Sequence, residues 1–295
     1  MQAEVAIIGA GPAGLAAAIQ LKRYRIPATV YEREEAGGLL RNANLVENYP
    51  GFPDGIPGQA MARLISAQAG RAGVQITFEQ VLVLAYDSGE FHLRTPQHTR
   101  RSPIVIVASG TSPRALPGLE IPESLRPKFF YEVHPLSDVS GKRIAIIGAG
   151  DAAFDYALNL SKANEIIILN RGERSNCLPL LWERASAAPG IQYRPNSTVK
   201  TVREGLSSEF VLKCEDPGGI TELAVDYLIA AIGRDPQTSF VSASIWKNCA
   251  DLEMQGVLYF IGDVKNGMYR QTSIAVGEGV LAAMKIYQRF KETGL

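Results

Sequence analysis

A chain of 295 residues is long for a single hydrophobic core, so two domains are expected. Hydrophobic residues make up 46% of the chain and charged residues 20%, the balance of a globular rather than a disordered protein. The 30 basic and 30 acidic residues cancel, which excludes a global basic field that would attract nucleic acid or anionic lipid.

The expected lack of a membrane span or signal peptide and the spacing of the cysteines point to a reducing compartment. No apolar run approaches the roughly 18 residues of a membrane span. The first strand is expected from residue 4, which leaves no room for a signal peptide. The three cysteines, Cys177, Cys214 and Cys249, are more than thirty positions apart, a spacing of neither a disulfide framework nor a zinc site. We therefore predict a cytoplasmic protein with no metal and no membrane or nucleic-acid partner.

The opening residues have the pattern of a dinucleotide-binding unit. An apolar run at 5–8 predicts a buried strand, an alanine-rich segment to about residue 24 predicts a helix, and 28–31 predicts a second strand. The motif Gly9-x-Gly11-x-x-Gly14 joins the first strand to the helix, whose N-terminal N–H groups favour a pyrophosphate. Glu32 ends the second strand, where a carboxylate can accept hydrogen bonds from an adenosine ribose.

This unit occurs a second time, 139 positions later (148 − 9). The segment 142–157 repeats the strand, the turn Gly148-x-Gly150-x-x-Ala153 and the helix, with a permitted alanine at the third glycine, and 165–169 predicts the next strand. Two such units predict two nucleotides in two domains. The alternative is a duplicated fold whose second copy has lost its ligand.

The remaining elements are expected in the following order. Segment 37–53 is a Gly- and Pro-rich loop, 113–127 and 233–236 are crossings between domains, and Gly262-Asp263 ends a buried strand. Helices are predicted at 57–72 and 273–290, and strands at 75–78, 81–86, 90–95, 104–107, 192–193, 199–202, 209–214, 223–230 and 257–261.

Together these residues resemble the low-molecular-weight thioredoxin reductase family and its relative, thioredoxin-reductase-like ferredoxin–NADP reductase. The resemblance spans nearly the whole chain, and its most specific segments are Val46-Glu-Asn-Tyr-Pro-Gly-Phe-Pro53 and Tyr269-Arg-Gln271. It implies an α/β fold with two Rossmann-like three-layer domains. An FAD domain, residues 1–113 and 236–295, is interrupted by an NAD(P)-binding domain, residues 114–235. A homodimer is also implied.

The resemblance also implies the cofactor-binding residues, with Asp263 on the ribityl chain and Arg270, Gln271 and Asn48 beside the flavin. The full FAD set is Gly9, Gly11, Pro12, Ala13, Gly14, Glu32, Arg33, Gly38, Leu39, Asn48, Val81, Ala108, Ser109, Gly110, Asp263, Arg270, Gln271 and Thr272. The NAD(P) set is Gly148, Gly150, Asp151, Ala152, Arg171, Arg174 and Gly233. No acid–base catalyst stands out.

The chain departs from the disulfide reductases of this family at their redox centre. Those enzymes carry Cys-x-x-Cys just before the second glycine-rich motif, where this chain has Tyr131 and His134. A lone thiol such as Cys177 cannot form the intramolecular disulfide that the relay requires. The ferredoxin–NADP reductase branch lacks these cysteines too, but it usually has a C-terminal extension that this chain does not show. The roles of Tyr131 and His134 stay open.

The second site also departs from the family pattern of His-Arg-Arg followed by another arginine. Here the strand ends Leu169-Asn170-Arg171-Gly172-Glu173-Arg174, which keeps two arginines for a 2′-phosphate and favours NADPH over NADH.

The sequence thus predicts an FAD-dependent oxidoreductase that passes electrons between NAD(P)H and a non-disulfide acceptor: ferredoxin, flavodoxin, a quinone or another small molecule. One alternative is a flavoprotein with a degenerate NAD(P)H site, reduced by a protein partner or acting without catalysis. Another is a disulfide reductase that works through a partner's thiols.

Overall fold

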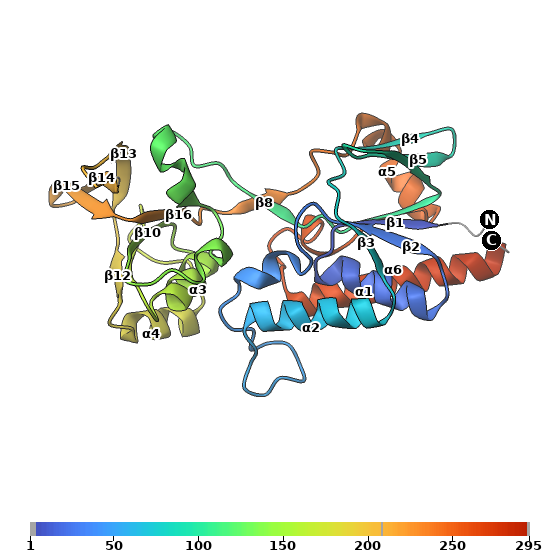
Figure 1. Ribbon diagram of the computed structural model, residues 1–295, viewed down its shortest axis with the longest axis horizontal. Coiled ribbons are helices and arrows are strands. Elements are labelled where there is room, and N and C mark those ends of the chain that lie inside the picture. The colour runs from blue at the N-terminus through green and yellow to red at the C-terminus, as the bar shows by residue number, and fades with distance from the viewer. Residues whose placement is uncertain (1–3, 208, 294–295) are drawn as a thin grey trace. The chain divides into compact units, whose positions relative to one another are not determined.

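The computed structural model describes residues 4–207 and 209–293, which form two compact units (Figure 1). Of the described residues, the first unit contains 4–41, 46–112 and 235–293, and the second contains 42–45 and 113–234. Segment 42–45 belongs to the second unit although the residues on both sides of it belong to the first. The chain therefore passes between the units four times, not only at the two expected crossings.

The first unit is built on a five-stranded parallel sheet in the order β18-β7-β1-β2-β3. The two central strands, β1 and β7, consist only of buried residues because both faces of the sheet are covered. The five strands are β1 (Val5–Ile8), β2 (Ala28–Tyr31), β3 (Gln75–Thr77), β7 (Ile104–Val107) and β18 (Leu258–Phe260).

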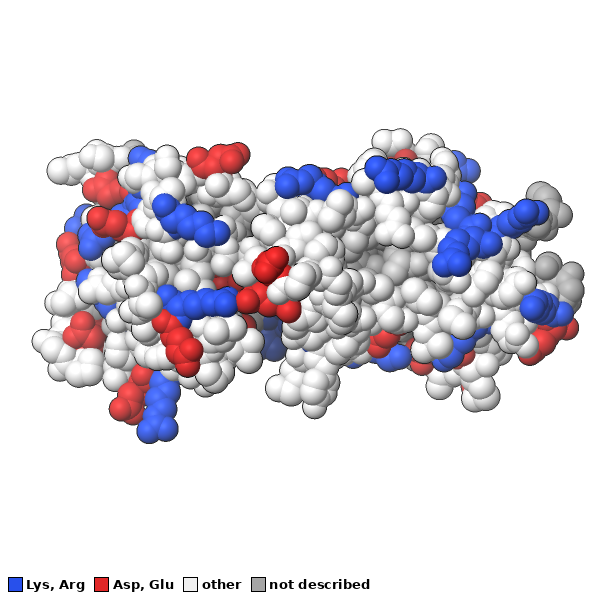
Figure 2. All heavy atoms as spheres, turned by 90° about the horizontal axis from the view of Figure 1, so that it is seen from below, with Lys and Arg blue, Asp and Glu red and all other residues white. Residues whose placement is uncertain are grey.

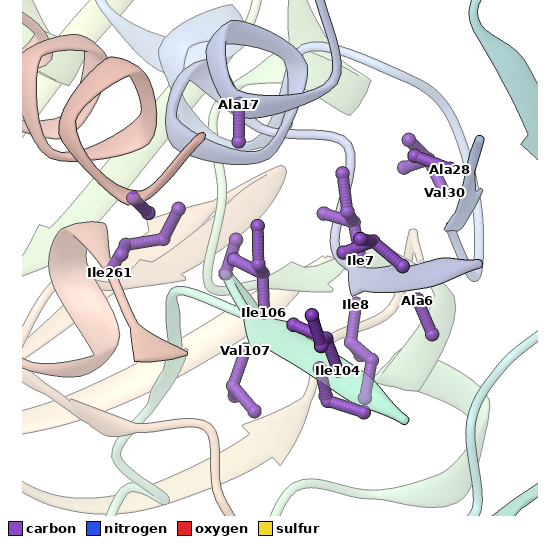
Figure 3. Close-up of a cluster of buried hydrophobic side chains, with 14 of the residues drawn as sticks. Ala6, Ile7, Ile8, Ala17, Ala28, Val30, Ile104, Ile106, Val107 and Ile261 are labelled. Carbon is purple, nitrogen blue, oxygen red and sulfur yellow. The ribbon is translucent and has the colours of Figure 1, made fainter. Parts of the chain in front are cut away.

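Helices cover one face of this sheet and a second, antiparallel sheet covers the other (Figure 1). Ile7 points toward Ala17 of the helical layer, while its neighbours Ala6 and Ile8 point to the opposite side (Figure 3). The helical layer contains α1 (Pro12–Arg23), α2 (Gly58–Arg71) and α6 (Thr272–Thr293); the other layer contains β4 (Val83–Asp87), β5 (Glu90–Arg94), β6 (Thr99–Ser102) and α5 (Ala243–Met254). Two 3-10 turns, η1 (Gly38–Asn42) and η4 (Gly262–Val264), follow β2 and β18.

The second unit repeats this plan with a parallel sheet in the order β12-β11-β10-β16-β9. Ile144 and Ile146 pack with the helices, whereas Ala145 between them packs with the antiparallel sheet, as the period of a strand requires. The elements are β9 (Phe129–Phe130), β10 (Arg143–Ile147), α3 (Asp151–Leu160), β11 (Glu165–Leu169), α4 (Pro179–Ala187), β12 (Ile191–Arg194), β13 (Thr198–Glu204), β14 (Phe210–Asp216), β15 (Gly219–Val225) and β16 (Tyr227–Ala230), with 3-10 turns η2 (Glu123–Lys128) and η3 (His134–Leu136).

A two-stranded sheet of β8 (Thr111–Pro113) and β17 (Arg234–Pro236) forms where the chain leaves and re-enters the first unit. One expected strand, 223–230, is wrong as a single element, because Val225 ends β15 of the antiparallel sheet and Tyr227 begins β16 of the parallel one. The sequence also did not predict β6, α4 or α5. β6 reads Thr-Arg-Arg-Ser and has no apolar alternation to reveal it.

Two properties of the described residues bear on function. No helix among them is both long enough and apolar enough to cross a membrane. Within residues 4–207 and 209–293, no three His, Cys, Asp or Glu side chains are grouped to hold a metal ion. The face of the molecule in Figure 2 carries both acidic and basic side chains, in keeping with the balanced composition.

Candidate cofactor sites

The first glycine-rich turn lies where β1 and β7 end side by side. Gly9 has a φ angle of +108°, and a Cβ atom there would lie 2.3 Å from the carbonyl oxygen of Ala108. A Cβ atom on Gly14 would lie 2.0 Å from the carbonyl oxygen of Gly9. Both positions therefore require glycine for packing of the protein itself. The structure brings the predicted residues Gly9, Gly14 and Ala108 together at the carboxyl edge of the sheet.

Gly11 is under no such constraint from the protein. A Cβ atom on Gly11 would meet nothing closer than the Cα atom of Gly38, at 4.0 Å. Gly11 is also the N-cap of α1, and no side chain there caps the helix, so the first N–H groups of α1 are not satisfied by a cap. Open space in front of uncapped helical N–H groups fits the pyrophosphate of FAD. The residues present therefore fit FAD at this turn.

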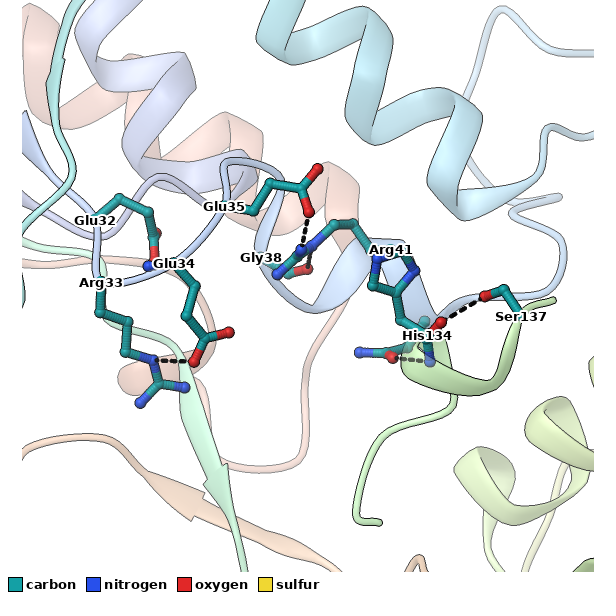
Figure 4. Close-up of polar contacts among 9 residues, drawn as sticks. Glu32, Arg33, Glu34, Glu35, Gly38, Arg41, His134 and Ser137 are labelled. Atoms are coloured by element: carbon teal, nitrogen blue, oxygen red, sulfur yellow. Dashed lines mark hydrogen bonds and ion pairs between the residues drawn. The ribbon is translucent and has the colours of Figure 1, made fainter. Parts of the chain in front are cut away.

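Glu32 follows β2, and its carboxylate accepts a hydrogen bond from the first glycine-rich turn. One carboxylate oxygen, Oε2, accepts the backbone N–H of Ala10 at 2.8 Å, and the other accepts the N–H of Glu34 at 3.1 Å. These bonds fix the carboxylate at the carboxyl end of β2, beside the glycine-rich turn. Arg33, next in the chain, extends outward and forms an ion pair with Glu34 at 3.4 Å (Figure 4).

Other predicted FAD residues meet although they are far apart in the sequence. The Asn48 side chain donates a hydrogen bond to Oε1 of Gln271 at 2.8 Å. Ser109 donates its hydroxyl to the carbonyl of Gln237 at 2.7 Å. Of the remaining predicted residues, Pro12 and Ala13 begin α1, Gly38 and Leu39 lie in η1, Val81 is buried before β4, Gly110 precedes β8, Asp263 lies in η4, Arg270 lies two residues before α6, and Thr272 begins α6.

Sequence reasoning missed Glu278, which holds the Gly262–Asp263 turn. Its Oε2 atom accepts the N–H of Gly262 at 2.6 Å and the side-chain amide of Asn266 at 2.9 Å. The sequence signal for Glu278 is an acidic residue within the run of small residues Ala275-Val-Gly-Glu-Gly279. This run lies in α6, which packs closely on α1. Glu278 therefore positions the backbone that carries Asp263.

The second glycine-rich turn has the same backbone geometry as the first. Gly148 has a φ angle of +132°, and a Cβ atom there would lie 2.2 Å from the carbonyl oxygen of Ala231. Gly150 is the uncapped N-cap of α3, and a Cβ atom on it would meet nothing within 4 Å. This turn, too, leaves open space before a helix N-terminus that no side chain caps. The residues present fit a nucleotide pyrophosphate.

The loop after β11 is held against this turn by three polar residues. The buried Asn170 accepts the N–H of Gly172 at 3.0 Å and donates to the carbonyl of Arg174 at 3.0 Å and the hydroxyl of Tyr193 at 2.7 Å. Asp151 accepts the N–H of Leu178 at 2.8 Å, and the N–H of Asn176 binds the carbonyl of Ala149 at 2.9 Å. Asn170 was not predicted as a site residue, although a buried polar residue ending a strand is a recognisable signal.

The two arginines of this loop are exposed. Neither Arg171 nor Arg174 forms an ion pair with any residue that the structure describes, so both guanidinium groups can contact an anion. Ala152 lies in the first turn of α3, and the carbonyl of Gly233 accepts the N–H of Arg114 at 3.0 Å near the end of the unit.

The positions expected for redox thiols carry a phenol and an imidazole. The Tyr131 hydroxyl accepts the N–H of Leu116 at 3.3 Å, and its ring packs edge-on against Phe129. The His134 N–H binds Asn42 Oδ1 at 3.0 Å. Its ring atom Nδ1 is buried and has no hydrogen-bond partner among the described residues. Neither side chain can form a disulfide.

The three cysteines are free and lie in three separate places. Cys177 packs with the helical side of the second unit, Cys214 with its antiparallel sheet, and Cys249 lies in α5 of the first unit. Burial raises the pKa of the Cys214 thiol and, with Glu253 as a second cause, that of the Cys249 thiol. A raised pKa lowers the thiolate fraction and hence the nucleophilicity of these two groups.

Comparisons with known proteins agree with this geometry. The pyridine nucleotide-disulphide oxidoreductase family matches residues 3–279. A thioredoxin reductase of Neurospora crassa is 31% identical over 96% of this chain and 92% of its own length, and one of Streptomyces coelicolor is 32% identical over 95% and 91%.

Solved structures give the same answer for the fold. Thioredoxin reductase of Lactococcus lactis, in its FR conformation, superimposes with a TM-score of 0.83 at 25% identity, covering 98% of this chain and 99% of that one. Thioredoxin reductase of T. acidophilum gives a TM-score of 0.82 at 27% identity, covering 96% and 97%. The predicted fold class, α/β with two Rossmann-like domains, is thereby confirmed. The chain belongs to the pyridine nucleotide-disulphide oxidoreductase family and is a thioredoxin-reductase-like, FAD-dependent NAD(P)H oxidoreductase.

Proposed function

We propose that this enzyme transfers electrons from NADPH through FAD to an acceptor that is not a protein disulfide reduced by an internal dithiol. One observation carries the proposal: the chain has no pair of cysteines within reach of a Cys-x-x-Cys spacing. Tyr131 and His134 occupy the expected thiol positions. The names of its thioredoxin reductase relatives therefore do not by themselves identify the electron acceptor of this enzyme.

In this proposal the first unit holds FAD. Gly11 and the N-terminus of α1 receive the pyrophosphate, Glu32 accepts hydrogen bonds from the ribose, and Asn48, Asp263 and Gln271 lie toward the flavin. FAD supplies the redox chemistry when bound, so the task of these residues is to position it and exclude water. Support comes from the open Gly11 position and from the Asn48–Gln271 hydrogen bond, which orders two distant segments.

The second unit would hold the nicotinamide cofactor at Gly148 and Gly150. Arg171 and Arg174 would select NADPH over NADH through charge-assisted hydrogen bonds to the 2′-phosphate. The absence of an acid at the end of β11, where Asn170 stands, supports this choice because no carboxylate repels the phosphate from that position. The acceptor class comprises ferredoxin, flavodoxin, a quinone or another small molecule. A homodimer remains a prediction, and sedimentation of the purified protein tests it.

The first experiment is an anaerobic titration of the purified protein with NADPH and then NADH, following the absorbance of oxidised flavin. We expect rapid bleaching by NADPH and slower bleaching by NADH. If neither bleaches the flavin while dithionite does, the second site is vestigial and the proposed donor is wrong.

The acceptor is then tested with a variant in which Cys177, Cys214 and Cys249 are all changed to serine. Wild type and variant are assayed with menadione, ferricyanide and ferredoxin, and separately with thioredoxin and a small aromatic disulfide. We expect equal turnover of the non-disulfide acceptors by both proteins at equal flavin content. Turnover of thioredoxin by wild type that the variant loses would overturn the proposed acceptor class.

A further inference from the structure

A polar pocket in the first unit is lined by none of the residues predicted to bind FAD, although its Tyr31 directly precedes Glu32 in the chain. The antiparallel sheet β4–β6 packs over β7 and is hydrogen-bonded to β1 through Ser102, but it has three strands, whereas the parallel sheet beneath it has five. Part of the sheet face over β2 and β3 is therefore left uncovered. Thr29, Tyr31 and Thr77 form the floor of a cavity of about 340 Å³ at this place.

The basic side of the pocket is Arg100 of β6. Its guanidinium group forms no ion pair or hydrogen bond with any residue in the described ranges. Arg100 lies close enough to Tyr31 to lower the pKa of the phenol, while burial and the Glu4 carboxylate raise that pKa more strongly. Tyr31 thus keeps its proton. Its hydroxyl, in a residue only 8% exposed, has no hydrogen-bond partner among the described residues. The Arg100 guanidinium group and the Tyr31 hydroxyl are therefore two hydrogen-bond donors that line the cavity and have no acceptor among the described residues.

The acidic side is formed by Glu4 and Glu79. The Glu79 side chain is only 12% exposed, accepts the Thr95 hydroxyl and has His98 Nε2 3.7 Å from its Oε1 atom. Glu4 accepts the Thr29 hydroxyl. Neutral hydroxyl groups thus orient both carboxylates, and no Lys or Arg of the described residues is ion-paired with either. A mostly buried carboxylate without a Lys or Arg partner is costly, so a cationic group in the cavity would lower the free energy of this arrangement.

The two sides together define one class of ligand. Arg101 also lines the pocket but is ion-paired with Glu90 at 3.8 Å, so the basic group that faces Glu4 and Glu79 is Arg100. A simple anion would therefore face two carboxylates, and a simple cation would face the Arg100 guanidinium group. A molecule with both charges satisfies both sides. The cavity volume is at the low end for small-molecule sites. We propose that this pocket binds a small zwitterion of amino-acid size, with its carboxylate on Arg100 and Tyr31 and its ammonium group toward Glu79 and Glu4.

The test is calorimetric titration of the FAD-loaded protein with glycine, β-alanine and γ-aminobutyrate, which differ in the separation of their charges. Butyrate and butylamine serve as probes with one charge each. We expect saturable binding of at least one zwitterion, at least tenfold tighter than that of either singly charged probe. Absence of binding by all three zwitterions, or equally tight binding of butyrate or butylamine, overturns the proposal.

Variants locate the binding. Arg100→Met and Glu79→Gln should each weaken the best zwitterion at least tenfold, because each removes one of the two charge contacts. Arg94→Met is the matched control: Arg94 lies on β5 next to the inward-facing Leu93 and does not line the pocket. Unchanged flavin absorbance shows that each variant is folded. Equal loss in Arg94→Met and Arg100→Met would show that binding depends on net charge alone, and the proposed site would be wrong.

Discussion

The two glycine-rich units share a backbone and differ in the side chain at the end of their second strand. Gly9 and Gly148 are enclosed in the same way: a Cβ atom would lie 2.3 Å and 2.2 Å, respectively, from the carbonyl oxygen of the residue that follows the neighbouring strand. After β2 stands Glu32, whose carboxylate binds the turn; at the end of β11 stands Asn170, whose amide binds its own loop. In the proposed function, each turn receives a nucleotide pyrophosphate and the residue after the strand helps to select which nucleotide binds.

The third motif position shows a smaller difference between the units. Gly14 cannot carry a side chain, because a Cβ atom would overlap the Gly9 carbonyl. The second unit has Ala153, fully buried, at the equivalent position. Helix α3 thus leaves room for a methyl group where α1 does not. Close approach of α1 to the turn is a property of the first unit alone.

The largest effect is expected from Gly9→Ala. It combines a left-handed φ angle with overlap of a backbone carbonyl, and we expect a cost above about 3 kcal/mol and loss of FAD. Gly51→Ala is the control: Gly51 has a φ angle of +106°, but a Cβ atom there meets nothing within 4 Å. It should cost only about 1–2 kcal/mol. Thermal midpoints and bound flavin are the readouts. Equal effects of the two variants would refute the role of the Ala108 carbonyl.

Glu32→Ala should weaken FAD retention about 10- to 100-fold, because a charged acceptor is lost and the Ala10 N–H loses its partner. Flavin content after extensive dialysis measures the effect. Glu34→Ala removes a nearby exposed carboxylate whose ion pair among the described residues is with Arg33, and it should leave flavin content unchanged. Full flavin loading of Glu32→Ala would contradict the assignment of the first site.

A third comparison concerns Asp155 of α3, which stands where α1 has Ala16. Its Oδ2 atom accepts the Asn44 N–H at 2.9 Å, yet burial raises its pKa to about 6 from an ordinary 3.8. Folding therefore favours the protonated form, and its contribution to stability is complete below pH 3.8 and declines as the pH rises through 6. The Lys162 charge opposes this shift and the Asp151 charge adds to it.

Asp155→Asn should therefore stabilise the protein by about 1–2 kcal/mol at pH 7.5 and have little effect at pH 4. Thermal midpoints of wild type and variant across this pH range measure the difference. Asp226→Asn is the control: the Asp226 carboxylate is half-buried, pairs with Lys142 at 3.8 Å and accepts the Arg143 N–H at 2.9 Å, and this variant should not show the pattern. A gap between Asp155→Asn and wild type that does not change with pH would show that the carboxylate is not the cause.

The smallest effect is expected from the exposed arginines of the second site. Arg171→Ala and Arg174→Ala should each raise KM for NADPH about five- to tenfold and leave KM for NADH nearly unchanged. Arg203→Ala, which removes an exposed arginine of β13 paired with Glu222 of β15, should change neither. Equal increases for NADH and NADPH would mean that these arginines do not contact the 2′-phosphate.

Much of this molecule was predictable from local pattern. The strands at 5–8, 28–31, 104–107 and 165–169 were recognisable because buried parallel strands are short apolar runs, and both glycine motifs followed directly from them. The split of 223–230 into β15 and β16 was not recognisable, because the residues of this segment on both sides of Asp226 are apolar and Asp226 alone separates the two strands. Helix α5 was also missed; Ile245 and Leu252 are its only fully buried described residues, and two positions make a weak periodic signal.

The sequence by itself determined the family, the two cofactors and the lack of a thiol pair, because these depend on residue types at fixed spacings. Only the tertiary structure decided which residues meet across long separations. Asn48 binds Gln271, Glu278 holds Gly262, and segment 42–45 joins the second unit. The tertiary structure alone revealed the pocket at Tyr31 and Arg100. Such contacts depend on how sheets and helices pack, and packing is a property of surfaces that residues from several segments share.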